Sequence, residues 1–265
     1  MARVEFRGVT KIYGKSSKKK SAKEPQPVVA VNNLSFIVED KEFMVIVGPS
    51  GCGKTTTLRL LAGLETQDSG YILLDNENID DIPVGKRDVQ MVFQNYALWP
   101  HMKVFNEKDL TNISFALKIR NWLPQNIIRQ AQAVSQKVGL ESQWFNRKPS
   151  QLSEGQKQRV AIGRSIILTP KVLLLDEPVT NLDPPARVKM RNEIRKLHDD
   201  TGMTIIYVTH NMADAMAMAD RIAVMKDGAF VQLATPQELW EHPVNEFVKD
   251  FIEAYSMARR FGVSH

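Results

Sequence analysis

An apolar stretch that runs directly into a glycine-rich turn constrains this chain more than any other feature. The stretch EFMVIVG, residues 42–48, has the pattern of a buried strand, and the turn GPSGCGKT, residues 48–55, matches G-x-x-x-x-G-K-[ST] before a helical stretch at 54–63. Glycines let the backbone wrap so that successive N–H groups point at phosphate oxygens, and the start of the helix adds the positive end of its dipole. The sequence therefore predicts a nucleotide site, with Lys54 on the β- and γ-phosphates and Thr55 on Mg²⁺.

Short apolar stretches alternate with helical stretches through most of the chain, which is typical of a parallel sheet covered by helices. Segment 106–150 interrupts the alternation with a mostly helical pattern, predicted as a lobe beside the sheet. After residue 234 we expect an amphipathic helical tail that packs on the body through apolar side chains such as Leu239 and Trp240, with contact to a partner as the alternative. The strands expected are residues 4–13, 28–39, 70–79, 89–94, 171–178, 204–210, 221–228 and 229–234, and the further helices start at about 153 and 185.

The net charge of +5 is concentrated in one segment. Residues 15–27 hold five Lys and one Glu, which is +4, so the rest of the chain is nearly neutral. We interpret the segment as a basic surface loop, with attraction to anionic lipid headgroups or nucleic acid as the alternative. Because it has no aromatic side chain for bases to stack on, nucleic acid is not an expected partner.

Three further observations limit the class of protein. The longest apolar runs, such as residues 172–175, are far too short to span a bilayer. The first residues have no signal-peptide pattern, and the single cysteine, Cys52, fits a reducing compartment. The expectation is an ordinary globular ATP-binding chain inside the cell.

Polar side chains follow three of the predicted strands. Asp176 and Glu177 end the strand VLLLDEP, where Asp176 can hold the Mg²⁺ shell and Glu177 can polarise a water in line with the γ-phosphate. His210 ends TIIYVTH and could contact the γ-phosphate, while the amide of Gln94, which ends VQMVFQ, could ligate Mg²⁺ or hold the attacking water. Each is weak evidence alone, but together with the glycine-rich turn they form a strong constellation.

The segment LSEGQKQRV, residues 152–160, has the pattern of a helix start. Ser153 and Gln156 have the spacing of a capping box, in which each side chain satisfies a backbone N–H at the helix start. Gly155 lies inside the first turn, where glycine costs about 1 kcal/mol relative to alanine. The pattern of a helix start does not by itself explain why a glycine stands at this position.

With these motifs in place, the sequence resembles the nucleotide-binding subunits of ABC transporters over nearly its whole length. The resemblance rests on the Walker A turn GPSGCGKT, the Q-loop Gln94, the signature LSEGQ, the Walker B strand VLLLDE, the D-loop TNLD at 180–183 and the switch histidine His210. It implies an α/β fold: a P-loop NTPase core with a mainly parallel sheet, an N-terminal antiparallel β subdomain and a helical lobe that carries the signature. The implied single domain divides into a core (1–94 and 165–235), the lobe (95–164) and a C-terminal helical extension (236–265).

The resemblance also implies roles for individual residues. Glu177, His210 and Gln94 would be catalytic, and Thr55, Gln94 and Asp176 would hold Mg²⁺. Two subunits would pair head to tail, so that each ATP lies between the Walker A turn of one chain and the signature of the other. The residues expected on ATP are Tyr13, which would stack on adenine, then Gly48, Pro49, Ser50, Gly51, Cys52, Gly53, Lys54, Thr55 and Thr56, and from the signature and D-loop Ser153, Gly155, Gln156 and Asp183.

The implied partners are a second ATPase subunit, a transmembrane permease at the cytoplasmic face of the plasma membrane and, indirectly, an extracytoplasmic solute-binding protein. KRDVQMVFQNYALWPHM and FALKIR look most like ATPases of bacterial carbohydrate importers, with polyamine and ferric-iron importers close behind. The alternatives are a soluble ABC ATPase of DNA repair or translation, an exporter ATPase, and a P-loop small-molecule kinase, which would lack LSEGQ.

Several positions depart from the family pattern. The basic loop 15–27 and the stretch around 106–111 are longer than usual, and Thr180 replaces a common Ser while keeping the hydroxyl. Glu154 stands where the family usually has a second Gly, and we expect its carboxylate to point to solvent. No β-rich regulatory domain is expected after the helical extension, because the sequence stops at His265.

Overall fold

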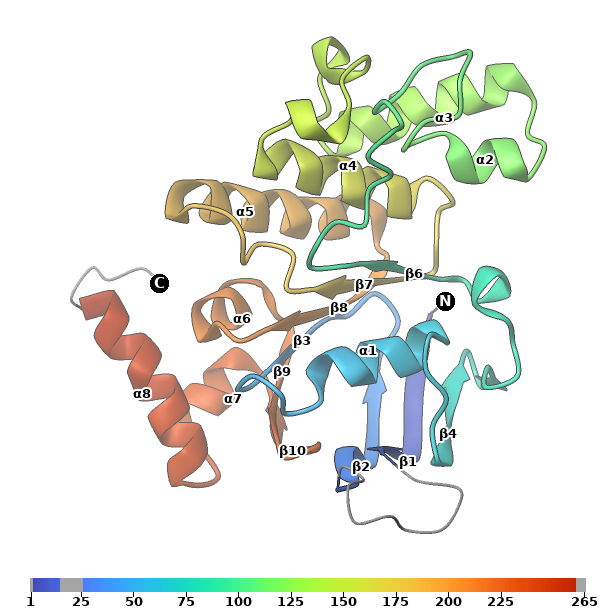
Figure 1. The fold of residues 1–265 in the computed structure, drawn as a ribbon. Helices are drawn as coiled ribbons and strands as arrows, with labels where there is room; N and C mark the ends of the chain where they lie inside the picture. The colour runs from blue at the N-terminus through green and yellow to red at the C-terminus, as the bar shows by residue number, and fades with distance from the viewer. Residues whose placement is uncertain (1, 15–25, 261–265) are drawn as a thin grey trace. The chain divides into compact units, whose positions relative to one another are not determined.

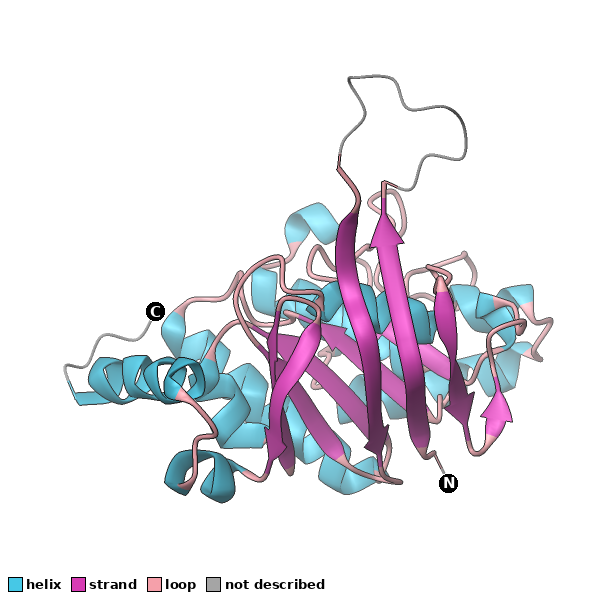
Figure 2. Ribbon diagram, turned by 90° about the horizontal axis from the view of Figure 1, so that it is seen from below, coloured by secondary structure: helices cyan, strands magenta, loops and turns pink. Residues whose placement is uncertain are grey.

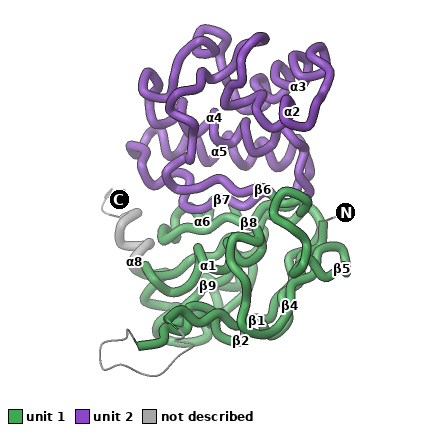
Figure 3. The backbone as a smooth tube through the Cα atoms, turned by 45° about the vertical axis from the view of Figure 1, so that its right-hand side comes forward, with its two compact units in different colours: residues 1–89, 204–265 green, residues 90–203 purple. Residues whose placement is uncertain are grey.

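The computed structural model describes residues 2–14 and 26–260, which form two compact units (Figure 3). Unit 1 comprises residues 1–89 and 204–265, and unit 2 comprises residues 90–203. Most of the basic loop expected at 15–27 lies outside the described residues. Among the helices described, none has an apolar stretch long enough to cross a membrane.

Unit 1 contains an antiparallel sheet with the strand order β2-β1-β4-β5, in which the long strands β1 and β2 run side by side (Figure 2). These strands are β1 Val4–Tyr13, β2 Val28–Val38, β4 Ser69–Leu74 and β5 Glu77–Asn78. The strand expected at 70–79 is wrong in one respect, because Asp75 and Asn76 adopt left-handed conformations, with φ of 52° and 68°, and make a hairpin turn. Asp and Asn tolerate this conformation better than most residues, so the pair Asp75-Asn76 in the sequence indicates a turn.

The parallel part of unit 1 is built around β3 Phe43–Val47, which pairs in parallel with β8 Thr204–Thr209 on one side and β9 Arg221–Lys226 on the other. β10 Ala229–Ala234 pairs antiparallel with β9. Every side chain of β3 is buried, as expected for a strand covered on both faces. Helix α1 Lys54–Ala62 follows β3, α6 Met212–Met218 follows β8, and the 3₁₀ turn η1 Val84–Lys86 precedes β6 (Figure 1).

The tail of unit 1 is helical, as predicted. It consists of α7 Pro236–Glu241 and α8 Glu246–Arg260. Leu239, Val248 and Ile252 are buried, which confirms packing on the body, but Trp240 remains 52% exposed. Trp240 was expected to pack on the body because its side chain is apolar, but about half of that residue remains exposed to solvent.

Unit 2 contains the neighbouring strands β6 Val89–Val92 and β7 Val172–Asp176 and the helices between and after them. The helices are α2 Phe115–Ile119, α3 Pro124–Lys137, α4 Glu154–Ile166 and α5 Pro184–Thr201, with 3₁₀ turns η2 Ser142–Trp144 and η3 Pro149–Gln151. The helical prediction for 106–150 is confirmed over α2 and α3. Residues 106–114 form turns instead, held by the buried Asn112, whose amide donates to the Trp99 and Met102 carbonyl oxygens.

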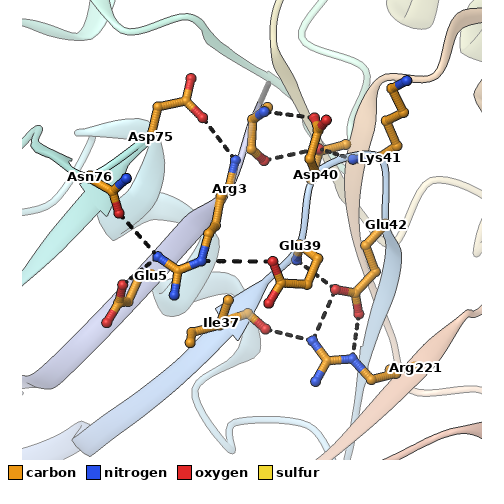
Figure 4. Close-up of polar contacts among 12 residues, drawn as sticks. Arg3, Glu5, Ile37, Glu39, Asp40, Lys41, Glu42, Asp75, Asn76 and Arg221 are labelled. Carbon is orange, nitrogen blue, oxygen red and sulfur yellow. Dashed lines mark hydrogen bonds and ion pairs between the residues drawn. The ribbon is translucent and has the colours of Figure 1, made fainter.

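Hydrogen bonds and ion pairs connect residues of unit 1 at the end of the sheet where β3, β8 and β9 begin (Figure 4). The buried Glu42 carboxylate accepts hydrogen bonds from Nε and Nη2 of Arg221 at 2.8 and 2.9 Å, and Arg221 also donates to the Ile37 carbonyl oxygen. On β1, the guanidinium groups of Arg7 and Arg3 hold the pKa of Glu5 down to about 2. These contacts fix the starts of the strands whose opposite ends carry the candidate site.

Candidate functional site

The P-loop, residues 48–55, joins β3 to α1 in unit 1. Two of its glycines have no room for a side chain, because a Cβ on Gly48 would lie 2.2 Å from the Met225 carbonyl oxygen and one on Gly53 would lie 2.1 Å from the Ala30 carbonyl oxygen. Gly53 also has φ of 109°, a conformation that side chains disfavour. By contrast, a Cβ on Gly51 would meet no atom within 4 Å. One side of the loop thus packs against the backbone of Ala30 and Met225. At its tip, Pro49 and Ser50 are exposed to solvent.

The ammonium group of Lys54 lies inside this loop. Lys54 is 5% exposed, and its Nζ donates to the carbonyl oxygens of Gly48 and Pro49, each at 2.8 Å. Gly53 is the N-cap residue of α1, and it has no side chain that could cap the helix start. A buried positive charge next to an open helix N-terminus and a wrapped backbone is suited to bind phosphate. The residues present therefore fit the phosphates of a nucleotide.

Cys52 is a structural member of the loop. Its side chain is buried, and burial raises the pKa of the thiol, an effect that the nearby Lys54 charge partly opposes. Its backbone carbonyl accepts a hydrogen bond from Gly228 N at 3.0 Å, which ties the loop to the turn between β9 and β10. The thiol is thus kept protonated near neutral pH, consistent with a packing role.

His210 emerges at the same edge of unit 1 as the P-loop. In the parallel pairing of β3 with β8, Val47 lies opposite Thr209, so the residues that follow, Gly48 and His210, leave the sheet side by side. His210 is exposed and follows the strand directly. The sequence-based expectation that these two segments meet agrees with this register.

Tyr13 and the two threonines complete the predicted residues of unit 1. Tyr13 is half-buried at the end of β1, opposite Val28 of β2, and the Lys11 ammonium lies 5.2 Å from the centre of its ring. Val28 is two residues from Ala30, the residue against which Gly53 packs. Thr55 and Thr56 are half-buried in the first turn of α1.

Unit 2 places the predicted acids at the end of β7. Asp176 is its last residue and is 6% exposed. Glu177 follows in a left-handed conformation, with φ of 46°, which is uncommon for a residue with a side chain. The Thr180 hydroxyl donates to Glu177 Oε2 at 3.0 Å. The D-loop therefore holds the carboxylate, a contact that sequence reasoning did not predict.

Gln94 lies just beyond β6, and its side chain is exposed. The Asn181 amide of the D-loop donates to the Gln94 carbonyl oxygen at 3.3 Å. Asp183 begins α5 and caps it, since its Oδ1 accepts from Ala186 N at 2.8 Å. The hydrogen bond from the Asn181 side chain to the Gln94 main chain thus joins the D-loop to the Q-loop within unit 2.

The signature segment forms the start of α4. The predicted capping box is confirmed: Ser153 Oγ accepts from Gln156 N at 3.3 Å, and Gln156 Oε1 accepts from Ser153 N at 3.0 Å. A Cβ on Gly155 would meet nothing within 4 Å, so no neighbour among the residues that the structure describes requires a glycine there. Glu154 is exposed, as expected, and its carboxylate forms an ion pair with Lys157 Nζ at 2.7 Å. That ion pair holds the pKa of Glu154 below its ordinary value.

Tyr96 is a residue of this region that sequence reasoning missed. It lies two positions after Gln94 and is 7% exposed. Burial, and next the Glu154 carboxylate, raise the pKa of the phenol to about 12. The only sequence signal was an aromatic residue close to the Q-loop glutamine.

Comparison with known proteins shows the family to which the sequence is similar. The ABC transporter family model matches residues 31–180. The osmoprotective compounds uptake ATP-binding protein GgtA of Synechocystis sp. is 46% identical over 97% of this chain and 66% of its own length. The trehalose/maltose import ATP-binding protein MalK of Thermococcus litoralis is 45% identical over 95% of this chain and 64% of its own length. The chain thus spans slightly less than two thirds of these relatives.

A solved structure gives the same result for the fold. The dimeric, post-hydrolysis structure of the ATP-binding cassette MJ0796 bound to ADP and Pi matches with a TM-score of 0.74 and 28% identity, covering 88% of this chain and 98% of that one. The predicted α/β cassette fold, with an antiparallel sheet beside a sheet rich in parallel strands, is therefore confirmed.

Proposed function

The chain belongs to the ABC transporter family, and on that premise we propose that it binds and hydrolyses ATP to power solute uptake through a separate permease. The observation that carries the proposal is the P-loop, in which the buried Lys54 ammonium lies within a wrapped backbone. When phosphate arrives, Lys54 can exchange the carbonyl oxygens of Gly48 and Pro49 for the oxygens of the β- and γ-phosphates. The N–H groups at the start of α1 then face the same phosphates.

Hydrolysis is assigned to the strand-end residues. Glu177 is the general base or water-positioning group, and the Thr180 hydroxyl restrains its carboxylate. His210 senses the γ-phosphate, and Gln94 holds the attacking water or the metal. Thr55, Gln94 and Asp176 would hold Mg²⁺, which would supply positive charge to offset the charge of the phosphates.

The proposed active form is a head-to-tail homodimer. MJ0796 is dimeric with ADP and Pi bound, which supports pairing of this kind for the present chain. In the pair, Ser153, Gly155 and Gln156 of one subunit face the γ-phosphate bound by Lys54 of the other, and Asp183 lies on the shared ATP. Because Gly155 has open space around its Cα, a phosphate oxygen can approach the helix start there.

A carbohydrate is the proposed solute, and the family resemblance with the trehalose/maltose importer MalK supports it. GgtA, which takes up osmoprotective compounds, favours small polar solutes as the wider class. The remaining proposed partners are a permease and an extracytoplasmic solute-binding protein, with the chain at the cytoplasmic face of the membrane. Copurification with the permease, followed by transport assays with labelled sugars, tests this assignment.

The central test is Glu177→Gln. We expect the variant to bind ATP but to lose hydrolysis by about a hundredfold or more, because the amide cannot accept a proton from the attacking water. Bound ATP should then hold two chains together, visible as an ATP-dependent dimer by size-exclusion chromatography with light scattering.

Lys54→Ala is the matched control for nucleotide binding. It should lose most ATP affinity by calorimetry and form no ATP-dependent dimer, also in combination with Glu177→Gln. Full ATPase turnover in Glu177→Gln would refute the role of the glutamate, while unchanged ATP affinity in Lys54→Ala would refute the P-loop assignment.

A further inference from the structure

Lys11 lies two residues before Tyr13 on β1, and its ammonium group contacts the tyrosine ring. The Nζ atom lies over the ring, 5.2 Å from its centre. A cation in this position is attracted to the negative face of the aromatic ring. Lys11 therefore occupies one face of the side chain that is expected to stack on adenine.

Two further contacts fix the position of this ammonium. Lys11 Nζ donates to the Thr66 carbonyl oxygen at 2.7 Å and forms an ion pair with Glu65 Oε2 at 3.4 Å. The Lys11 side chain is only 16% exposed, so water and salt weaken these contacts less than they weaken those of a fully exposed lysine. The ammonium thus has a carbonyl oxygen, a carboxylate and a ring as partners.

The acceptors of Lys11 belong to the segment that follows helix α1 in unit 1. Glu65 N donates to the Arg59 carbonyl oxygen, in the last turn of α1, at 3.3 Å. The same segment also contacts the strand directly, because Asp68 Oδ2 accepts from Ile12 N at 2.6 Å. Since α1 begins at the P-loop, Lys11 connects the tyrosine ring to the element that is proposed to bind phosphate.

An aromatic ring that is already oriented binds a base better than one that must first be ordered. Tyr13 is half-buried and is the last residue of β1. A side chain that is held in one orientation before binding loses less conformational entropy when the ligand arrives. Because the ammonium occupies one face, a base that stacks on Tyr13 must use the opposite face.

We propose that Lys11 is a positioning residue, whose ammonium holds the Tyr13 ring in the orientation that stacks on the adenine of the bound nucleotide. The role rests on the proposed ATPase function and on stacking by Tyr13. Lys11 acts on the base through the ring, whereas Lys54 and the P-loop backbone act on the phosphates. The contribution of Lys11 to affinity therefore depends on whether the ligand has a base.

The test compares ADP with pyrophosphate, which lacks the base, and the proposed reaction consumes neither ligand. Calorimetry on the full chain measures both affinities. Lys11→Met keeps a long side chain and removes the charge. We expect it to raise the Kd for ADP about fivefold and to change the Kd for pyrophosphate by less than about twofold, because the P-loop still binds phosphate.

Two further variants serve as controls. Tyr13→Leu removes the ring, so in this background Lys11→Met should change the Kd for ADP by less than about twofold. Lys249→Met removes the same charge from α8, where the lysine side chain is 50% exposed, and should leave both affinities unchanged.

A merely structural role of Lys11 would weaken the binding of both ligands to a similar extent. Equal losses for ADP and pyrophosphate, an unchanged ADP affinity in Lys11→Met, or the same loss in the Tyr13→Leu background would overturn the proposal. None of these results would affect the P-loop assignment. A wild-type chain that binds neither ligand would instead overturn the proposed function itself.

Discussion

At the scale of single residues, the glycines of the candidate site are present for different structural reasons. Gly48 and Gly53 are required by contacts within the chain, because a Cβ would meet carbonyl oxygens at 2.2 and 2.1 Å. Gly155 has open space, so the fold itself does not explain why a helix-weakening residue is present. The explanation we propose lies in a second chain, whose phosphate needs the space.

Gly155→Ala therefore separates stability from activity. In the isolated chain we expect the variant to be more stable by about 0.5 to 1 kcal/mol, which raises the thermal midpoint by about 2 °C, because alanine favours the helix. ATPase activity should fall by at least about tenfold, because the methyl group blocks the phosphate oxygen. Gly85→Ala is the control, because it adds a methyl group in open space within η1, outside the proposed site. A Gly155→Ala chain with full activity would argue against the phosphate contact.

At the scale of elements, sequence patterns located the strands well and the irregular segments poorly. The strands ending at Val47 and Thr209 were expected from their apolar runs, and their register brings Gly48 and His210 together as predicted. The turns at 106–114 depend on Asn112, which is fully buried among distant carbonyl groups. Such a contact exists only in the folded chain, so no local pattern predicts it.

Strand β1 gives a prediction about pH. The pKa of Glu5 is lowered from 4.5 to about 2 by Arg7 and Arg3. A lowered carboxyl pKa contributes stability above its unfolded value, near pH 4.5, and this contribution is lost as the pH falls toward 2. Wild type should therefore be more stable than Glu5→Gln at pH 7, and the difference should shrink between about pH 4.5 and 2 in urea unfolding experiments. A difference that does not vary with pH would contradict the ion-pair explanation.

At the scale of the whole molecule, the residues proposed to bind and hydrolyse ATP are divided between the two compact units. Lys54, Thr55 and His210 belong to unit 1, whereas Gln94, Asp176 and Glu177 belong to unit 2. The order of the motifs along the sequence identified these residues, and the resemblance to the nucleotide-binding subunits of ABC transporters implied their roles. What the sequence did not contain is the set of contacts that holds them, such as Thr180 on Glu177 and Asn181 on Gln94.

Hydrogen exchange tests whether one nucleotide engages both units. If Mg²⁺-ATP is held by residues of both, its addition should slow amide exchange in α1 of unit 1 and at the end of β7 of unit 2. Glu177→Gln is the suitable background because its ATP is not consumed, and the same protein with Lys54→Ala should show no protection. Protection confined to unit 1 would mean that Asp176 and Gln94 do not hold the ligand.

The position of the Lys54 ammonium has a consequence for the proposed catalytic cycle, at the stage when no nucleotide is bound. With its two carbonyl acceptors at 2.8 Å, the charge is already satisfied before any nucleotide arrives. If the chain hydrolyses ATP as proposed, ADP can leave without exposing an unpaired cation, and the loop need not refold before the next nucleotide binds. The two carbonyl oxygens accept the hydrogen bonds of the lysine while no nucleotide is bound. Exchange of ADP for ATP then changes only the hydrogen-bond acceptors of the lysine and does not rearrange the chain.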